Sequence, residues 1–343
     1  MSSMHLTPNL YKRSAEQEPI RNGFGRGLVE AGRRDGQVVA LCADLTGSTR
    51  MKAFSQEFPD RYIEVGVAEQ NLVTTASGMA HMDKVPFASS YAAFSPGRNW
   101  EQIRTTICLN DQNVKIAGSH AGISVGPDGA THQMLEDIAL MRVLPNMRVI
   151  VPCDSVQAEK ATLEMAAEIG PMYLRLAREK TPIVTSDDTP FEIGKSYVYR
   201  KGGDVSLVAT GSMVYHALKS AASLKQAGIS AEVINCATIK PFDRETIVAS
   251  AQKTGRVVTL EEGQINGGLA AAVAETLGES QPAPLLRIGI EDQFGESGQP
   301  DELMKRFGLT APDITQKIKS FLGAETGAKS KNPGKTKSKG GHK

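Results

Sequence analysis

The stretch Tyr62-Ile-Glu-Val-Gly-Val-Ala-Glu-Gln-Asn71 passes from a strand-like run through a glycine turn into the start of an apolar helix. In open α/β sheets, ligands bind beyond the carboxyl ends of the strands, and this turn places Glu69 there. Burial at such a position disfavours a charged carboxylate, so Glu69 could hold a proton near neutral pH and donate it. A glutamate in a first helical turn is also stabilised by the helix dipole alone, and this stretch by itself leaves both interpretations open.

Outward from this stretch, the first part of the chain alternates between strand and helix patterns. From about residue 20 to residue 182, short apolar runs alternate with stretches of helical spacing, such as Ile20, Phe24 and Leu28. Strands that are apolar along their whole length and separated by helices indicate a parallel sheet covered on both faces. The predicted strands are residues 38–43, 62–65, 85–89, 114–118, 148–151 and 172–176, and the predicted helices include 99–109, 134–142 and 155–167.

A second unit of the same kind begins near Gly194, after a polar stretch. Its predicted strands are residues 205–209, 231–236, 256–260 and 285–290, with helices at 214–227, 244–252 and 268–277. We therefore predict an α/β fold of two doubly wound, mostly parallel-sheet domains, residues 15–185 and 194–323, each with its own core. Residues 324–343 hold six lysines and one acid. They are expected to form a disordered, solvated tail rather than an anchor for RNA or another polyanion.

The composition excludes several classes of protein. Apolar residues make up 40% of the chain and charged residues 22%, which is typical of a globular protein. Lysine plus arginine number 39 and aspartate plus glutamate 38, so the net charge of +1 gives no reason to expect nucleic acid or a membrane as a partner. The four cysteines are widely spaced and are expected to be reduced and buried. With no signal-like apolar run near the N-terminus, these features predict a cytoplasmic protein.

A second motif, Ser119-His-Ala-Gly-Ile-Ser-Val-Gly-Pro-Asp-Gly-Ala-Thr-His-Gln133, follows the predicted strand 114–118. It brings two histidines, His120 and His132, and one acid, Asp128, into a glycine-rich loop. Such a loop is too polar to belong to a core, and two histidines beside an aspartate favour a functional site over structural histidines. A third motif, Ala43-Asp-Leu-Thr-Gly-Ser48, also follows a strand, but taken alone it could be only a turn or a helix cap.

Together the three motifs resemble the transketolase family, and the resemblance runs from about residue 21 to residue 322. It implies a pyrimidine-binding fold for thiamine diphosphate, followed by a C-terminal domain that chiefly builds the dimer. In that family the glutamate matching Glu69 hydrogen-bonds N1′ of the aminopyrimidine, so that the 4′-amino group becomes the base that removes the proton from thiazolium C2. The resemblance therefore makes Glu69 the first candidate for a catalytic residue.

The resemblance also implies roles for other residues. Tyr91 and Phe94, in the segment from Pro86 to Phe94, match the aromatic pocket of the pyrimidine ring, and Asp44 is assigned to the cofactor site. Ala88 stands where relatives often carry another aromatic residue, while Phe87 is expected in the core. Asp128 and His132 resemble residues at the donor's hydroxyls and reacting carbonyl, where they would stabilise developing charge. The positions that resemble the family's contacts to the sugar phosphate are Arg21, Ser48, His120 and Arg178.

One family motif is missing from the sequence. The family holds the diphosphate and Mg²⁺ with Gly-Asp-Gly and a later asparagine, and no Gly-Asp-Gly occurs here. The similar run Gly203-Asp204-Val205 enters a predicted strand and is better explained as a turn. No metal ligand is therefore assigned to this chain. The resemblance implies a separate N-terminal subunit that carries the missing motif, in an assembly with two copies of each chain and self-association through the C-terminal domain.

The resulting functional prediction is the C-terminal subunit of a split transketolase, active only with its partner. It would transfer a two-carbon ketol unit from a ketose phosphate to an aldose phosphate through a thiamine-diphosphate carbanion. Three alternatives remain open at this point. They are half of a 1-deoxy-xylulose-5-phosphate synthase, which shares the Asp-Gly-x-Thr-His-Gln loop, the β subunit of a 2-oxo-acid dehydrogenase, and a catalytically silent regulatory subunit. The intact Glu69, Asp128 and His132 argue against the last.

Overall fold

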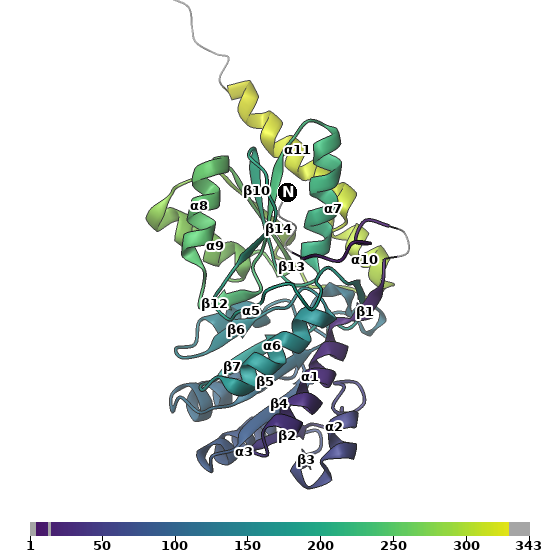
Figure 1. The fold of residues 1–343 in the computed structure, drawn as a ribbon, viewed down its shortest axis with the longest axis vertical. Coiled ribbons are helices and arrows are strands. Elements are labelled where there is room, and N and C mark those ends of the chain that lie inside the picture. The colour runs from purple at the N-terminus through teal and green to yellow at the C-terminus, as the bar shows by residue number, and fades with distance from the viewer. Residues whose placement is uncertain (1–4, 13–14, 329–343) are drawn as a thin grey trace, which may run out of the picture.

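The computed structural model describes residues 5–12 and 15–328, with the side chains of residues 324–328 left out, and contains two α/β units joined end to end (Figure 1). The first unit holds a seven-stranded sheet, the second a five-stranded sheet. Both sheets are mostly parallel, so the predicted fold class is confirmed. None of the helices in the described ranges combines the length and apolar character that a membrane span requires.

Six parallel strands and one antiparallel edge strand form the first sheet. The strand order is β12-β6-β7-β5-β4-β2-β3. The bounds are β2 Val38–Cys42, β3 Tyr62–Glu64, β4 Val85–Tyr91, β5 Lys115–Ser119, β6 Arg148–Ile150, β7 Met172–Arg175 and β12 Thr238–Lys240. Every residue of β2, β5 and β7 is buried, because helices cover both faces. This burial explains why these strands read as unbroken apolar runs.

The helices of the first unit follow the strands along the chain. On one face, α1 (Ile20–Arg34) crosses α6 (Ser155–Ala167) so closely that a Cβ on Gly23 would lie 1.8 Å from the carbonyl oxygen of Ser155. Only glycine fits there. The remaining helical segments are α2 Lys52–Glu57, η1 Pro59–Arg61, α3 Glu69–His81, α4 Trp100–Gln102, the π-helix η2 Ile103–Cys108, the 3₁₀ segment η3 Ile123–Asp128 and α5 Asp137–Arg142.

The second sheet has the order β14-β13-β10-β11-β9, and only β9 runs antiparallel to its neighbour. Its strands are β9 Tyr197–Arg200, β10 Val205–Ala209, β11 Ala231–Asn235, β13 Val257–Gln264 and β14 Leu285–Ile290. Figure 1 shows α7 and α11 on one side of this sheet and α8 and α9 on the other. The helices are α7 Met213–Gln226, α8 Arg244–Thr254, α9 Leu269–Ser280, α10 Pro300–Arg306 and α11 Ala311–Ala328.

The two units share one cluster of buried side chains, in addition to a cluster within the first unit and another that lies largely within the second. After β11 of the second unit, the chain adds β12 to the edge of the first sheet, antiparallel to β6. One cluster of buried side chains consequently contains Leu41 and Ile116 of the first sheet together with Val208 and Val257 of the second. A separate two-stranded ribbon, β1 (Gln17–Pro19) with β8 (Lys180–Pro182), ties the two ends of the first unit together.

Three sequence expectations differ from the structure in detail. The helix expected at 134–142 begins only at Asp137, because the preceding residues continue the glycine-rich loop. The helix expected at 99–109 is a short α-helical turn followed by a π-helix. The tail expected from residue 324 begins as the end of α11, which continues through Ala328 because alanine and glutamate favour helix there. Residues 329–343, the rest of that prediction, lie outside the described residues.

The strand order predicts where a ligand binds. In the first sheet, β2 lies between β3 and β4, so the chain adds strands to one side and then to the other. At such a switch point the connections leaving the carboxyl ends diverge and open a crevice. The loops that follow β2, β3, β4, β5 and β7 all leave the carboxyl end of the sheet. They and the adjoining ends of strands and helices carry the residues singled out in the sequence, except for Arg21, which lies on α1.

Candidate active site

Glu69 is the first residue of α3 and is buried, with 3% of its surface exposed. Gly66, with a φ of +72°, turns the chain from β3 towards the helix. Arg98 donates a 3.1 Å hydrogen bond to Oε2 of Glu69, while Oε1 accepts none from any described residue. The amide of Asn99 holds the backbone carbonyl of Glu69 at 2.8 Å. The carboxyl group is thus fixed in place with one oxygen available to a ligand.

Aromatic rings lie beside this carboxyl group. The guanidinium of Arg98 lies 4.8 Å from the centroid of the Phe94 ring, and Phe94 is stacked near Tyr91 with 6.0 Å between centroids. Tyr91 in turn stacks on His120 at 3.8 Å. The edge of His132 faces Phe94 at 5.3 Å. These contacts make a continuous line of flat groups running from Glu69 to His120.

His120 is a neutral, buried histidine, and each of its two ring nitrogens has a hydrogen-bond partner. It is 1% exposed, and its backbone has a φ of +59°. Burial, reinforced by the positive charges of Arg21, Arg178 and Arg50, lowers the pKa of His120 to about 3. Since arginine can only donate, the 3.1 Å contact from Arg21 Nη1 makes Nε2 the acceptor. Nδ1 therefore carries the proton and donates to Ser119 Oγ at 2.8 Å.

Three arginines surround His120 with few acids to balance them. Arg21 donates from Nη1 to the carbonyl oxygen of Ser48 at 2.8 Å, and its Nε is buried with no hydrogen-bond partner among the described residues. Burial lowers the pKa of Arg21, as do the charges of Arg50 and Arg178. Arg178 donates to the carbonyl oxygen of Val125 at 2.6 Å and pairs with Glu179 at 3.3 Å. An anion placed here would relieve this repulsion.

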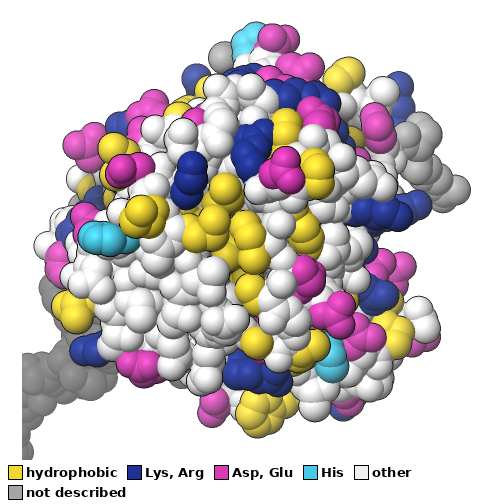
Figure 2. Space-filling view, turned by 90° about the horizontal axis from the view of Figure 1, so that it is seen from below, with side chains coloured by type: hydrophobic (Ala, Val, Ile, Leu, Met, Phe, Trp, Pro, Cys, Tyr) yellow, Lys and Arg dark blue, Asp and Glu magenta, His cyan; other side chains and the backbone are white. Residues whose placement is uncertain are grey.

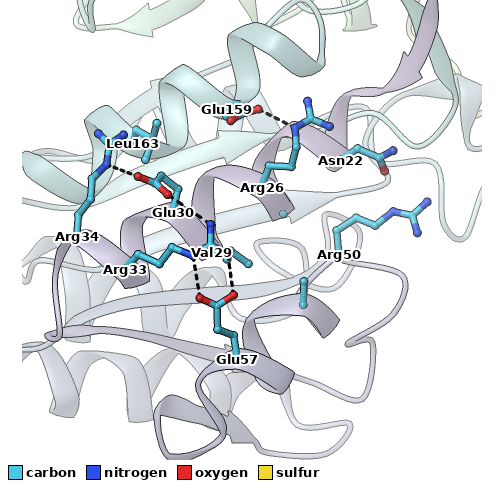
Figure 3. A pocket seen from close by; sticks show the side chains of 12 residues that line it. Asn22, Arg26, Val29, Glu30, Arg33, Arg34, Arg50, Glu57, Glu159 and Leu163 are labelled. Atoms are coloured by element: carbon cyan, nitrogen blue, oxygen red, sulfur yellow. Dashed lines mark hydrogen bonds and ion pairs between the residues drawn. The ribbon is translucent and has the colours of Figure 1, made fainter.

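Arg50 was not identified from the sequence, although it lies just beyond the Asp-Leu-Thr-x-Ser motif. It lines a surface cleft of about 790 Å³ between α1, α2 and α6 (Figure 3). The other arginines that the figure labels there are paired with glutamates, namely Arg26 with Glu159, Arg33 with Glu57 and Arg34 with Glu30. Among these arginines, only the Arg50 guanidinium has no ion pair or hydrogen bond within the described part of the chain; the Arg50 backbone amide donates to the carbonyl oxygen of Gly47 at 3.3 Å. Its unpaired charge joins the cluster around His120.

Residues 120–133, called the histidine loop here, carry the rest of the predicted site. His132 is partly exposed, and its Nδ1 lies 2.9 Å from Thr131 Oγ1. Asp128 ends η3 and is exposed, with no hydrogen bond or ion pair to a described residue. Gln133 is buried and donates from Nε2 to backbone carbonyls, so it supports the loop. Ring contacts therefore join both histidines to Tyr91 and Phe94, and the role of Asp128 remains a prediction.

The loop after β2 contributes its backbone more than its side chains. Asp44 is exposed, and its amide donates to Glu64 Oε1 at 2.7 Å. Glu64 also accepts from the amide of Gly66 at 3.0 Å, so it ties this loop to the turn before Glu69. Ser48 meets Arg21 through its carbonyl oxygen. Asp44 makes no contact of this kind with Glu69 or the aromatic rings, and its assignment to the cofactor remains a prediction.

The site fits the pyrimidine end of thiamine diphosphate. A flat, partly apolar ring needs an aromatic wall and a positioned carboxyl group, and Phe94, Tyr91 and Glu69 supply these. For the diphosphate end, no group of three or more metal-ligating side chains occurs among the described residues. The residues of this chain that would hold the ring of the cofactor are Glu69, Tyr91 and Phe94.

A doubly wound sheet with a buried glutamate and an aromatic wall at its switch point defines a pyrimidine-binding domain. Residues 17–184 match the family model "Transketolase, pyrimidine binding domain", and residues 194–314 match "Transketolase, C-terminal domain". The chain belongs to the transketolase family, and it carries these two domains in this order.

Its similarity to individual proteins covers nearly the whole chain. It is 45% identical to a "Putative transketolase C-terminal section" of Methanocaldococcus jannaschii, over 90% of this chain and 98% of that one. It is 44% identical to a 6-deoxy-6-sulfo-D-fructose transketolase subunit of Clostridium sp. (strain MSTE9), over 88% and 94%. A solved structure described as "Split gene transketolase, inactive beta4 tetramer" superposes with a TM-score of 0.84 at 45% identity, over 89% and 98%.

Proposed function

We propose that this chain is the C-terminal subunit of a split transketolase, which transfers a two-carbon ketol unit between phosphorylated sugars together with a diphosphate-binding subunit. The observation that carries the proposal is the buried carboxyl group of Glu69, held beside the Phe94 and Tyr91 rings with one oxygen free. Thiamine diphosphate, when bound, supplies the carbon nucleophile and stores the electrons of the broken carbon–carbon bond. The residues of this chain orient it and the sugar.

Glu69 holds and moves a proton in this proposal. Its free Oε1 would be the atom that exchanges a proton with a ring nitrogen of the pyrimidine when the cofactor is bound. The carboxyl group can act only if its position relative to the ring is fixed, and the hydrogen bonds from Arg98 and Asn99 fix it. Positioned acid–base groups of this type typically contribute about 10² to 10⁴ in rate.

In this proposal the histidines and the arginines contact different parts of the sugar substrate. His132 keeps one ring nitrogen free for a substrate oxygen, where hydrogen bonding stabilises developing negative charge. Arg21, Arg178 and Arg50 present unbalanced positive charge to the distal anion of the substrate. Asp128 is proposed to contact a donor hydroxyl. Arginine binds a phosphate or a sulfonate through the same charged hydrogen bonds, so this cluster alone does not choose between them.

The partner subunit is proposed to carry the Gly-Asp-Gly motif with Mg²⁺ and to dock on the end of the first unit at Glu69. Figure 2 views the first unit from the end at which Figure 1 places β3 and α3, and it shows apolar side chains gathered in the middle of this face, with charges towards the edges of the face. Val67, two residues before Glu69, is 72% exposed. Exposed apolar surface of this kind indicates a protein contact. We propose two copies of each chain, with self-association through the second unit, and a cytoplasmic location, supported by four free, buried cysteines.

An assay with several donor substrates distinguishes the proposed activity from the two alternative enzyme activities. The assembled pair, with thiamine diphosphate and Mg²⁺, is assayed with a ketose phosphate and its sulfonate analogue, each with an aldose phosphate acceptor, and with pyruvate. Ketol transfer from the sugar donors supports the proposal. Turnover of pyruvate with glyceraldehyde 3-phosphate would instead indicate the synthase, and oxidative decarboxylation of a 2-oxo acid the dehydrogenase. No turnover by a correctly assembled pair would support a silent subunit.

A further inference from the structure

The histidine loop is held by the second unit of the same chain, not only by the sheet from which it leaves. Its residues approach two segments of that unit. One is the end of β13 at Glu262, and the other is residues 295–300, which run into α10. The loop that carries His120 and His132 thus lies between the two units.

On one side, the Glu262 carboxylate bonds directly to the loop. Oε1 accepts a 2.8 Å hydrogen bond from the backbone amide of Ser124, and Oε2 accepts one of 2.6 Å from Ser212 Oγ. Glu262 is 3% exposed. A Cβ on Gly122 would lie 2.4 Å from Oε1, so the loop backbone approaches the carboxylate as closely as glycine permits. Charge-assisted hydrogen bonds to a backbone amide are strong when water is excluded.

The same position is anchored through its backbone. Arg175, at the end of β7, donates from Nη2 to the Glu262 carbonyl oxygen at 2.8 Å. Its Nε donates to Asp137 Oδ2 at 2.9 Å, and Tyr173 donates to the same oxygen at 2.8 Å. All these groups are buried. Glu262 is therefore clamped to the first sheet and cannot shift without moving a charged network.

On the other side, Gln133 bridges the loop and residues 295–298. Its Nε2 donates to the carbonyl oxygens of Ile123, Gly126 and Glu296 at 3.2, 3.2 and 3.0 Å. A Cβ on Gly129 would lie 2.4 Å from Ser297 Oγ. Two independent contacts from the second unit therefore fix both ends of the segment between the histidines.

We infer that Glu262 is a positioning residue for the active site, through which the second unit sets the placement of the histidine loop and hence of His120 and His132. Glu262 does not touch the proposed substrate site; it acts through the amide of Ser124. The second unit then contributes to catalysis within its own chain, beyond any part in subunit association. The catalytic consequence rests on the proposed function, whereas the effect on the loop does not.

The neighbouring residue on β13 provides a matched control. Glu261 is 1% exposed and also carries a carboxylate, but it accepts from the amides of Leu269 and Ala270 at the start of α9. Successive side chains on a strand point to opposite faces, so the two glutamates serve different elements. Glu261→Ala removes a buried carboxylate without touching the loop.

The first experiment measures amide hydrogen exchange in the isolated chain, without partner or cofactor. Glu262→Ala should lower the protection of residues 122–128 at least about tenfold and leave that of β10 unchanged. Glu261→Ala should instead lower the protection of residues 269–272. Glu262→Gln should restore most of the loop's protection, because its amide oxygen still accepts from Ser124 and the Ser212 hydroxyl can turn to accept from the amide nitrogen.

The second experiment measures ketol transfer by the assembled pair well below the unfolding temperature. Glu262→Ala should lower kcat/KM about 10- to 100-fold, with Glu262→Gln and Glu261→Ala within about threefold of wild type. If Glu262→Ala does not fold, Ser212→Ala is used in both experiments instead. It should lower the protection of residues 122–128 and kcat/KM in the same direction, but by less. Equal loop protection in Glu262→Ala and wild type, or equal effects of the two alanine variants on the loop, would overturn the inference. An inactive wild-type pair would count against the proposed function only, because the inference about Glu262 and the loop is still decided by hydrogen exchange.

Discussion

His120 ties the chemistry of the site to the pH dependence of folding. The unfolded chain protonates a histidine near pH 6.5, whereas burial and the neighbouring arginines lower the pKa of folded His120 to about 3. Between these values the unfolded state binds more protons than the folded state. The contribution of His120 to stability is therefore complete above about pH 6.5 and is lost as the pH falls towards 3.

Replacing His120 should flatten this part of the stability curve. From pH 6 to pH 5, the wild type should lose up to about 1 kcal/mol more unfolding free energy than His120→Gln, because only the unfolded wild type gains a proton at position 120 while the folded histidine stays neutral. Urea unfolding at several pH values provides the measurement. His81→Gln, at an exposed histidine of α3, is the control and should follow the wild type. Parallel curves for wild type and His120→Gln would show that His120 titrates normally.

Arg50 should weaken the folded chain slightly while strengthening its affinity for anions. It adds positive charge beside Arg21, and its guanidinium has no partner of its own in the described ranges. Arg50→Ala should leave the melting temperature unchanged or slightly higher in phosphate-free buffer, and should lower the affinity for inorganic phosphate about tenfold, as expected for one charge-assisted hydrogen bond. Melting curves over a phosphate titration measure both effects. Arg33→Ala, at a paired arginine of the same cleft, should respond to phosphate like the wild type.

Some residues of the candidate site could be identified from the sequence, and others could not. Glu69, Tyr91, Phe94 and His120 lie in the segments quoted from the sequence, and Arg21 was assigned by the family resemblance alone. The structure links all five by contacts. Arg98 and Glu262 carry no such signal, since their importance arises from what they meet in space. Arg50 follows a predicted motif directly, yet an arginine after a turn is ordinarily a surface residue.

Asp154 shows how one buried cap joins two elements. Its carboxylate accepts from the amide of Gln157 at the start of α6, and also from the amides of Val184 and Thr185 and the Thr185 hydroxyl. Asp154→Ala would leave several buried donors without a partner. We expect a loss of about 3 kcal/mol or more, above the 0.5–2 kcal/mol typical of a helix N-cap.

Chemical denaturation of two aspartate variants checks this value. Asp243 caps α8 by accepting from the amide and hydroxyl of Thr246 at 3.1 and 2.9 Å, and it also accepts from the amide of Ser196 at 2.8 Å, in a more exposed setting than the fully buried Asp154. Because water reaches a half-buried cap more easily, Asp243→Ala should cost less, within the range of about 0.5–2 kcal/mol for a helix N-cap. Similar losses for the two variants would mean that the complete burial of the Asp154 contacts adds nothing.

Strands within the parallel sheets were predictable because burial on both faces leaves a continuous apolar run. The strands β1, β8, β9 and β12 were missed, since each is short and pairs antiparallel at an edge, where one face or one side is open. Nothing local marks the sequence Thr238-Ile-Lys240 as part of the first sheet. Its pairing with β6 depends on the way the two units meet.

The shared core predicts that the described part of the chain unfolds as one cooperative body. β12 pairs with the first sheet, and Glu262 of the second unit accepts hydrogen bonds from Arg175 and Ser124 of the first. Because these contacts cross the boundary, neither unit keeps all of its buried surface when the other unfolds. Calorimetry should show one transition with equal calorimetric and van't Hoff enthalpies. Two resolved transitions would mean that the units are independent domains.

The division of the active site between two polypeptides is tested most directly by comparing ketol transfer in three samples with thiamine diphosphate and Mg²⁺: this chain alone, the diphosphate-binding partner alone, and their mixture. Only the mixture should be active, and Glu69→Ala in the mixture should reduce the rate by at least about 10² while the pair still assembles. Turnover by this chain alone, or full activity of the assembled Glu69→Ala pair, would contradict the account.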